Sequence, residues 1–190
     1  MKRGFQISPG FCMWAAVMIL TLPLNWLLAA VCAAAVHEAF HLLAIRLFGS
    51  RSAVGELRAW NAGISLPQLG RGKELLCALC GPAGGFLLCS LWAIWPEIAI
   101  CGFLQSLYNL LPIYPMDGGR ALHCLCAMLL PPHYAHLVSL WIGWICTGAL
   151  LAAGAYYSLV CHVGMLPLLI GTVAAIKANY ACKERDLALQ

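Results

Sequence analysis

Long apolar segments alternate with short polar ones along almost the whole chain. A helix needs about 20 mostly apolar residues to cross the hydrocarbon core of a membrane. We therefore expect an all-α polytopic membrane protein with about six transmembrane helices. Their approximate ranges are 9–22, 26–48, 74–95, 97–111, 133–157 and 163–180. A shorter amphipathic helix is expected at about 120–130, where Pro131 and Pro132 end it.

The connection between the second and third segments is more polar and alternates in a different way. Residues 53–60 alternate with a period of about two, and Asn61-Ala62-Gly63 follows as a turn signal. This pattern is typical of a short β-hairpin over residues 53–67, lying at the membrane surface. An irregular loop explains the same residues equally well.

Composition supports a membrane protein and excludes an ordinary soluble domain. Hydrophobic residues make up 63% of the 190 residues, charged residues 9%, and the mean hydropathy is +0.85. Little length remains for a separate soluble domain, so we expect one integral-membrane domain over residues 1–190.

The net charge of +4 does not point to nucleic-acid binding, because the basic residues are few and scattered among the connections. Their positions are better explained by the orientation of the chain in the membrane. With six spans and a cytoplasmic N-terminus, every basic residue falls on or near the cytoplasmic side. These residues are Lys2, Arg3, Arg46, Arg51, Arg58, Arg71, Lys73, Arg120, Lys177, Lys183 and Arg185. We therefore predict that both termini are cytoplasmic and that the lipid bilayer surrounds the chain.

The second apolar segment contains the pattern His-Glu-x-x-His at residues 37–41. On a helix, His37 and His41 share one face and can bind one zinc ion, while Glu38 can act as a general base toward a water molecule at that ion. Ionisable residues inside a membrane span are costly and usually functional. Two histidines still leave a catalytic zinc site one protein ligand short.

Asp117 is the candidate for the missing ligand. It follows Pro112 and Pro115, which interrupt helical geometry, and the expected topology places it on the same side and at the same depth as the motif. An aspartate oxygen is an acceptable zinc ligand, and two histidines with one carboxylate leave a fourth position open. The alternative is that Asp117 only caps the helix that follows Gly119.

Eleven cysteines are spread through the apolar segments, where a free cysteine packs as a small hydrophobic side chain. Two close pairs, Cys77 with Cys80 and Cys124 with Cys126, could instead form a second zinc or redox site. Packing is the better interpretation, because no polar shell accompanies either pair.

The motif at 37–41 and the sequence Asn109-Leu110-Leu111-Pro112-x-x-Pro115-x-Asp117-Gly118-Gly119 together resemble the site-2 protease family of intramembrane zinc metallopeptidases. The similarity covers about residues 26–120 and is greatest to the stage IV sporulation type, which processes a sigma-factor precursor. It implies zinc ligation by His37, His41 and Asp117, with Glu38 as general base. It also implies that Asn109 and Pro115 help to hold an extended substrate segment.

The resemblance implies regulated proteolysis of a membrane-associated protein in a bacterial cell membrane, with regulatory membrane proteins as further partners. No appended CBS or PDZ domain is expected. A membrane metal-binding or transport protein that uses the same ligands without hydrolysis is the alternative function. A catalytically silent membrane scaffold is a third.

Overall fold

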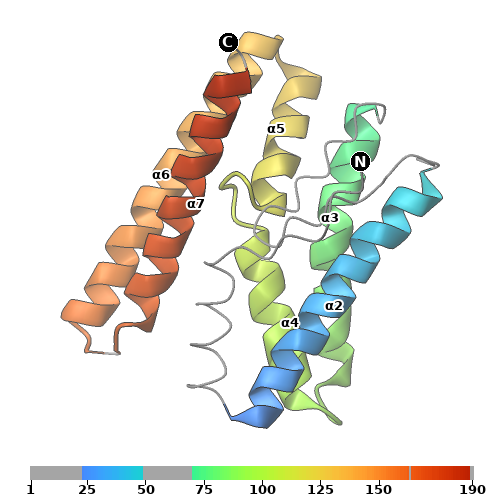
Figure 1. Ribbon diagram of the computed structural model, residues 1–190, viewed down its shortest axis with the longest axis vertical. Coiled ribbons are helices and arrows are strands. Elements are labelled where there is room, and N and C mark those ends of the chain that lie inside the picture. Colours follow the sequence, from blue (N-terminus) through green and yellow to red (C-terminus); the bar gives the residue numbers. More distant parts are fainter. Residues whose placement is uncertain (1–22, 49–69, 163, 189–190) are drawn as a thin grey trace, which may run out of the picture. The chain divides into compact units, whose positions relative to one another are not determined.

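The computed structural model describes residues 23–48, 70–162 and 164–188 of the chain. Within these ranges the chain is helical and contains no strand. The helices are α2 (Leu24–Leu47), α3 (Arg71–Leu87), the 3-10 helix η1 (Leu88–Leu91), α4 (Pro96–Asn109), α5 (Asp117–Leu129), α6 (Pro132–Leu159) and α7 (Leu166–Ala188). This confirms the all-helical fold class for the described residues (Figure 1).

Three stretches are long and apolar enough to cross a membrane: Leu24–Leu47, Arg71–Leu91 and Pro132–Leu159. Helix α4 has 14 residues, which gives about 21 Å against a hydrocarbon core of about 30 Å. The apolar part of α7 covers only Leu166–Ile176. Six spans therefore stay a prediction; the expected first span at 9–22 and the expected hairpin at 53–67 lie outside the described residues.

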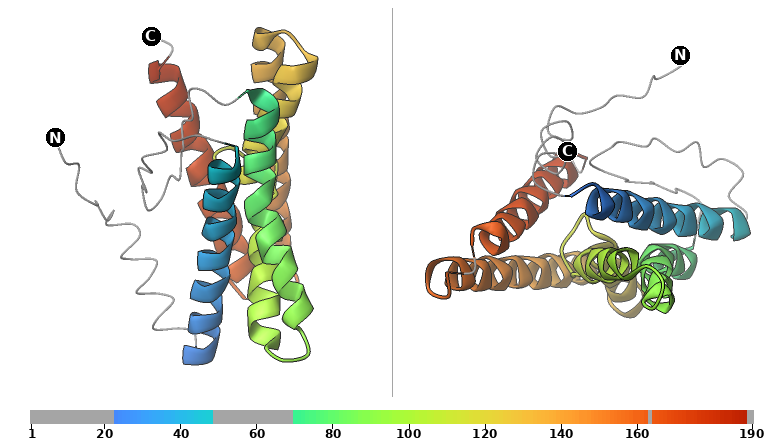
Figure 2. Two further views of the ribbon diagram at one scale, coloured as in Figure 1. Left: turned by 90° about the vertical axis from the view of Figure 1, so that its right-hand side faces the viewer. Right: turned by 90° about the horizontal axis from the view of Figure 1, so that it is seen from below.

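The chain divides into two compact units, Met1–Asn109 and Leu110–Gln190, which we describe separately. In the first unit α2 packs against both α3 and α4, and α3 packs against α4 (Figures 1 and 2). The expectation of a single domain over residues 1–190 stays a prediction.

Small residues line the contact between α3 and α4. A Cβ atom on Gly85 would lie 2.0 Å from the Ser106 hydroxyl and 2.9 Å from the Gly102 carbonyl oxygen. Pro82 lies inside α3, and the helix continues through it. The Gly-Pro-Ala-Gly-Gly stretch at 81–85 is therefore a packing seam, because small residues let the two helices approach closely.

In the second unit the connection from Leu110 to Met116 is non-helical, as its two prolines predicted. The Tyr114–Pro115 peptide bond is cis, and the Met116 amide donates to the Ile113 carbonyl at 2.9 Å. Helix α5 begins directly after this turn. Gly118 and Gly119 make room for the turn, because a Cβ on either residue would collide with backbone atoms of the connection.

Helix α6 packs against both α5 and α7. Only 17% of its most apolar window is buried, and large apolar side chains such as Trp141, Ile145 and Tyr156 are exposed along it. Such exposure is expected of a helix whose outer faces contact lipid. The outer surface of α6 therefore agrees with a membrane environment.

Candidate metal centre

Helix α2 places His37 and His41 on one buried face. Their side chains are 3% and 8% exposed, in a helix that otherwise carries mostly apolar residues. The two Nε2 atoms lie 3.2 Å apart, and the rings meet edge to face with centroids 4.8 Å apart. The four-residue spacing therefore brings two imidazole nitrogens to one point, as the sequence predicted.

Helix α3 fixes the orientation of the His41 ring. The Nδ1 atom of His41 lies 2.8 Å from the Cys77 carbonyl oxygen. A carbonyl oxygen only accepts hydrogen bonds, so Nδ1 carries the proton, and in the neutral ring Nε2 is then the nitrogen with the lone pair. A metal-binding histidine usually donates the proton of its other ring nitrogen to a carbonyl oxygen of this kind. The contact therefore leaves His41 Nε2 in the form that binds a metal.

Gly81, one turn after Cys77, provides the space that the ring occupies. A Cβ atom at this position would lie 2.1 Å from His41 Nε2 and 2.5 Å from Cε1. Any larger residue would have to push the imidazole away. The absence of a side chain at Gly81 is therefore a requirement of this ring position.

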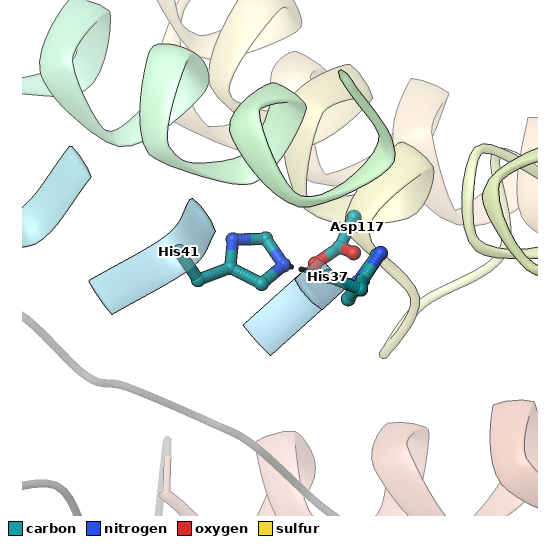
Figure 3. Close-up of side chains that lie close together, drawn as sticks. All are labelled: His37, His41 and Asp117. Carbon is teal, nitrogen blue, oxygen red and sulfur yellow. Dashed lines mark hydrogen bonds between the residues drawn. The ribbon is translucent and has the colours of Figure 1, made fainter. Parts of the chain in front are cut away.

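Asp117 is the first residue of α5 and is 9% exposed. The turn at residues 113–116 leads directly into it, and the Arg120 amide donates to the Met116 carbonyl at 3.0 Å to begin the helix. Together, His37, His41 and Asp117 offer one ligand atom each, all within 4.8 Å of one another (Figure 3). This buried group could hold a metal ion.

The positions of the two nitrogens fit tetrahedral coordination. Metal–nitrogen bonds of about 2.0–2.1 Å at a tetrahedral angle place two ligand nitrogens about 3.4 Å apart. The observed separation of 3.2 Å is close to this value. Two neutral imidazoles and a carboxylate also form a donor set that suits a divalent cation. The residues present therefore fit a metal ion.

Glu38, Asn109 and Pro115 are the remaining candidate residues, and their proposed roles stay predictions. Glu38 is half-buried on α2, next to His37 in sequence. Asn109 is the last residue of α4, and Pro115 lies in the turn before α5. Both are half-buried. The general-base role of Glu38 and the substrate-binding roles of Asn109 and Pro115 are untested.

The cysteine pairs agree with the packing interpretation. Cys77 is buried in a cluster with Ala44 and Ile45, and Cys80 packs against that cluster. Cys124 and Cys126 are also buried, and within the described ranges none of the four forms a disulfide. Among the residues that the structure describes, no metal-ligand group contains a cysteine.

Two elements of the site escaped the sequence analysis. The Cys77 carbonyl is a backbone group that every residue has, so the residue type at position 77 does not indicate the contact with His41. Gly81 did carry a signal, because it opens the run of small residues at 81–85. That signal indicated close helix packing without showing that the neighbouring atom would be a histidine nitrogen.

No protein-family model matches the chain, and no curated protein matches it. The resemblance to site-2 proteases therefore rests on the two motifs, and the function has to be argued from the site.

Proposed function

We propose that the chain is an intramembrane zinc metalloprotease that cleaves a protein substrate in or near a membrane segment. The observation that carries the proposal is the pair of Nε2 atoms 3.2 Å apart, with Asp117 completing a buried ligand group. The two histidines belong to a 24-residue apolar helix. Burial of ionisable side chains in such a helix costs free energy, so these residues usually belong to a functional site.

Zinc is the metal that best suits these ligands. It accepts imidazole nitrogen and carboxylate oxygen, and catalytic zinc sites use three protein ligands with a fourth position left open. When bound, zinc supplies Lewis acidity, which activates water and polarises a carbonyl group.

The protein's own groups would then perform the proton transfers. Glu38 follows His37 directly on α2 and serves as the base that accepts a proton from the attacking water. The same carboxyl group then returns the proton to the leaving amine. Cys77 keeps His41 in the tautomer that the ligand set needs, because its carbonyl accepts the Nδ1 proton at 2.8 Å.

The substrate must offer an accessible peptide carbonyl. Carbonyl groups in a helix are engaged in backbone hydrogen bonds, so a transmembrane substrate has to unwind locally before it is cleaved. The resemblance suggests that Asn109 and Pro115 hold the unwound segment. Asn109 directly precedes the non-helical stretch 110–116 and Pro115 lies within it, where the backbone is not committed to helical hydrogen bonds. The proposed substrates are membrane-associated proteins that undergo regulated proteolysis, such as a sigma-factor precursor.

Water has only a short distance to travel along α2. His41 lies six residues before Leu47, the last residue of the helix. At 1.5 Å per residue this separation is about 9 Å. In the proposed topology this helix end is cytoplasmic, so we propose that water enters from the cytoplasm.

The proposal is tested by replacing the base and keeping the ligands. Purified, zinc-loaded chain and its Glu38→Gln variant are incubated with single-span substrates, and cleavage and zinc content are both measured. We expect full zinc content in both and a loss of cleavage of about 100-fold or more in the variant, because general-base catalysis contributes about 10²–10⁴-fold. Glu74→Gln, in the first turn of α3, is the matched control. Equal cleavage by the chain and by Glu38→Gln would contradict the proposal and favour a metal-binding or transport role.

A further inference from the structure

The second unit contains a small cavity that the proposed chemistry does not use. It lies among the connection before α5 and helices α5, α6 and α7, the last through Ala178, and its volume is about 40 Å³. Ile113 and Tyr114 of the connection form one wall, and Ser139, Gly143 and Trp144 of α6 form another. Trp144 is 42% exposed, so the cavity reaches the surface of the helix.

A hydrogen-bonded pair lines the cavity. His123 Nδ1 lies 3.2 Å from Ser139 Oγ, and that hydroxyl donates to the His136 carbonyl at 3.0 Å. A hydroxyl group has one proton and two lone pairs. Because its proton is directed at the His136 carbonyl, Ser139 accepts the Nδ1 proton of His123. One lone pair of Ser139 Oγ is then left to accept a hydrogen bond from an occupant.

The size of the cavity limits that occupant. A single water molecule needs about 10–15 Å³, whereas a cavity of about 150 Å³ holds benzene. A volume of about 40 Å³ therefore admits a group of two or three heavy atoms and excludes an aromatic ring. Gly143 helps to keep the space open, because a Cβ there would have only the Pro112 carbonyl oxygen within 4 Å, at 3.4 Å.

The depth of the cavity indicates where the occupant comes from. Ser139 and Trp144 are the eighth and thirteenth residues of the 28-residue helix α6. At 1.5 Å per residue α6 is about 42 Å long, which exceeds the hydrocarbon core of about 30 Å by about 6 Å at each end. An α6 centred on the hydrocarbon core would place both residues inside the apolar layer. A hydroxyl-bearing side chain that reaches them laterally would then belong to another membrane segment.

We propose that this cavity is a specificity subsite for a serine or threonine side chain in the membrane segment of the substrate. The hydroxyl of that side chain donates to Ser139 Oγ, and its methyl or methylene carbon contacts Ile113 and Leu140. The inference rests on the proposed protease function. Its connection with the reaction is that Gly119, another lining residue, belongs to the same helical turn as Asp117.

The test compares threonine with valine, which has the same shape and lacks the hydroxyl. Single-span substrates carry Thr or Val at each of ten positions around the cleaved bond, and the full-length zinc-loaded chain cleaves them. We expect kcat/KM to be about three- to tenfold higher for threonine at one position, which is the contribution of one hydrogen bond. In Ser139→Ala that ratio should fall to about one.

Matched glycine variants separate the subsite from general damage to α6. Gly143→Ala narrows the cavity and should lower cleavage of the threonine substrate, whereas Gly148→Ala on the same helix meets no atom within 4 Å and should cleave as the unmodified chain does. A Thr-to-Val ratio near one at every position, or a preference that survives in Ser139→Ala, would overturn the subsite.

A second measurement does not depend on turnover. The Glu38→Gln chain is mixed with substrates that carry a photoreactive diazirine side chain at each of the ten positions, and the crosslinked residues are mapped by mass spectrometry. We expect one position to crosslink within residues 139–144. Crosslinks that never reach these residues would overturn the subsite. Absence of cleavage by the unmodified chain, with these crosslinks present, would count against the protease and keep the subsite.

Discussion

The position of the His41 imidazole depends on two features of α3: a backbone carbonyl oxygen and a residue without a side chain. Its Nδ1 atom is held by the Cys77 carbonyl at 2.8 Å, and its Nε2 atom occupies the space above Gly81. Both contacts involve backbone or a missing side chain. The ring position and tautomer of this candidate ligand therefore depend on residues whose side chains take no part in metal binding.

Replacement of Gly81 tests this dependence. In Gly81→Ala the new Cβ would lie 2.1 Å from His41 Nε2, so the ring has to leave its position and its bond to Cys77. We expect zinc affinity, measured by competition with a chelator, to fall by at least about tenfold, the lower end of the cost when a metal-binding histidine loses its hydrogen-bond partner. Gly72→Ala, on the same helix with no atom within 4 Å, should bind zinc normally. Equal zinc affinity in the two variants would show that the ring position is not needed.

At the scale of the element, the turn before α5 packs its backbone directly against Gly118 and Gly119 in the first turn of α5. A Cβ on Gly118 would lie 2.0 Å from the Leu110 carbonyl oxygen and 2.5 Å from that of Leu111. Both are backbone atoms, which cannot rotate away as a side chain can. The position of Asp117 at the start of α5 therefore requires glycine after it.

Gly118→Ala should destabilise the second unit. Overpacking of this kind costs about 1–3 kcal/mol, so we expect a lower midpoint of thermal unfolding in detergent. Gly148→Ala is the control, because its Cβ meets nothing within 4 Å, and alanine is about 1 kcal/mol more favourable than glycine inside a helix. The account of the turn is wrong if the two variants unfold at the same temperature.

The elements themselves were largely predictable. Apolar length located α2, α6 and the combined stretch of α3 and η1 to within a few residues, although α3 itself already ends at Leu87, and two prolines marked the end of α4 and the turn before α5. Ends that depend on packing were missed: α5 begins at Asp117 rather than near Arg120, and α7 continues to Ala188 rather than ending near residue 180. Tertiary contacts and helix propensity decide those ends, and apolar patterning does not record them.

The site was predictable where it depended on spacing. His37 and His41 meet because they are four residues apart on a helix. Asp117 required an argument from topology and from the family resemblance, because 75 residues separate it from the motif. The Cys77 carbonyl could not be predicted, since any residue has one.

At the scale of the whole molecule, the proposed topology places the connection between α6 and α7 on the outer side of the membrane. Cys161 lies in this connection and is an exposed free thiol. We expect a membrane-impermeant maleimide to label Cys161 in intact cells, with the labelled peptide identified by mass spectrometry. Labelling of Cys161 only after the cells are opened would reverse the topology and place the site at the other side of the membrane.

The central claim is that one zinc ion is held by His37, His41 and Asp117. Zinc analysis with X-ray absorption at the zinc edge tests it on the purified chain. We predict about one zinc per chain, with nitrogen and oxygen neighbours at about 2.0–2.1 Å and no sulfur at about 2.3 Å. The zinc content should fall in His41→Ala and in Asp117→Ala and persist in Glu38→Gln. A chain without zinc, a sulfur neighbour, or zinc retained in full by both ligand variants would contradict the claim.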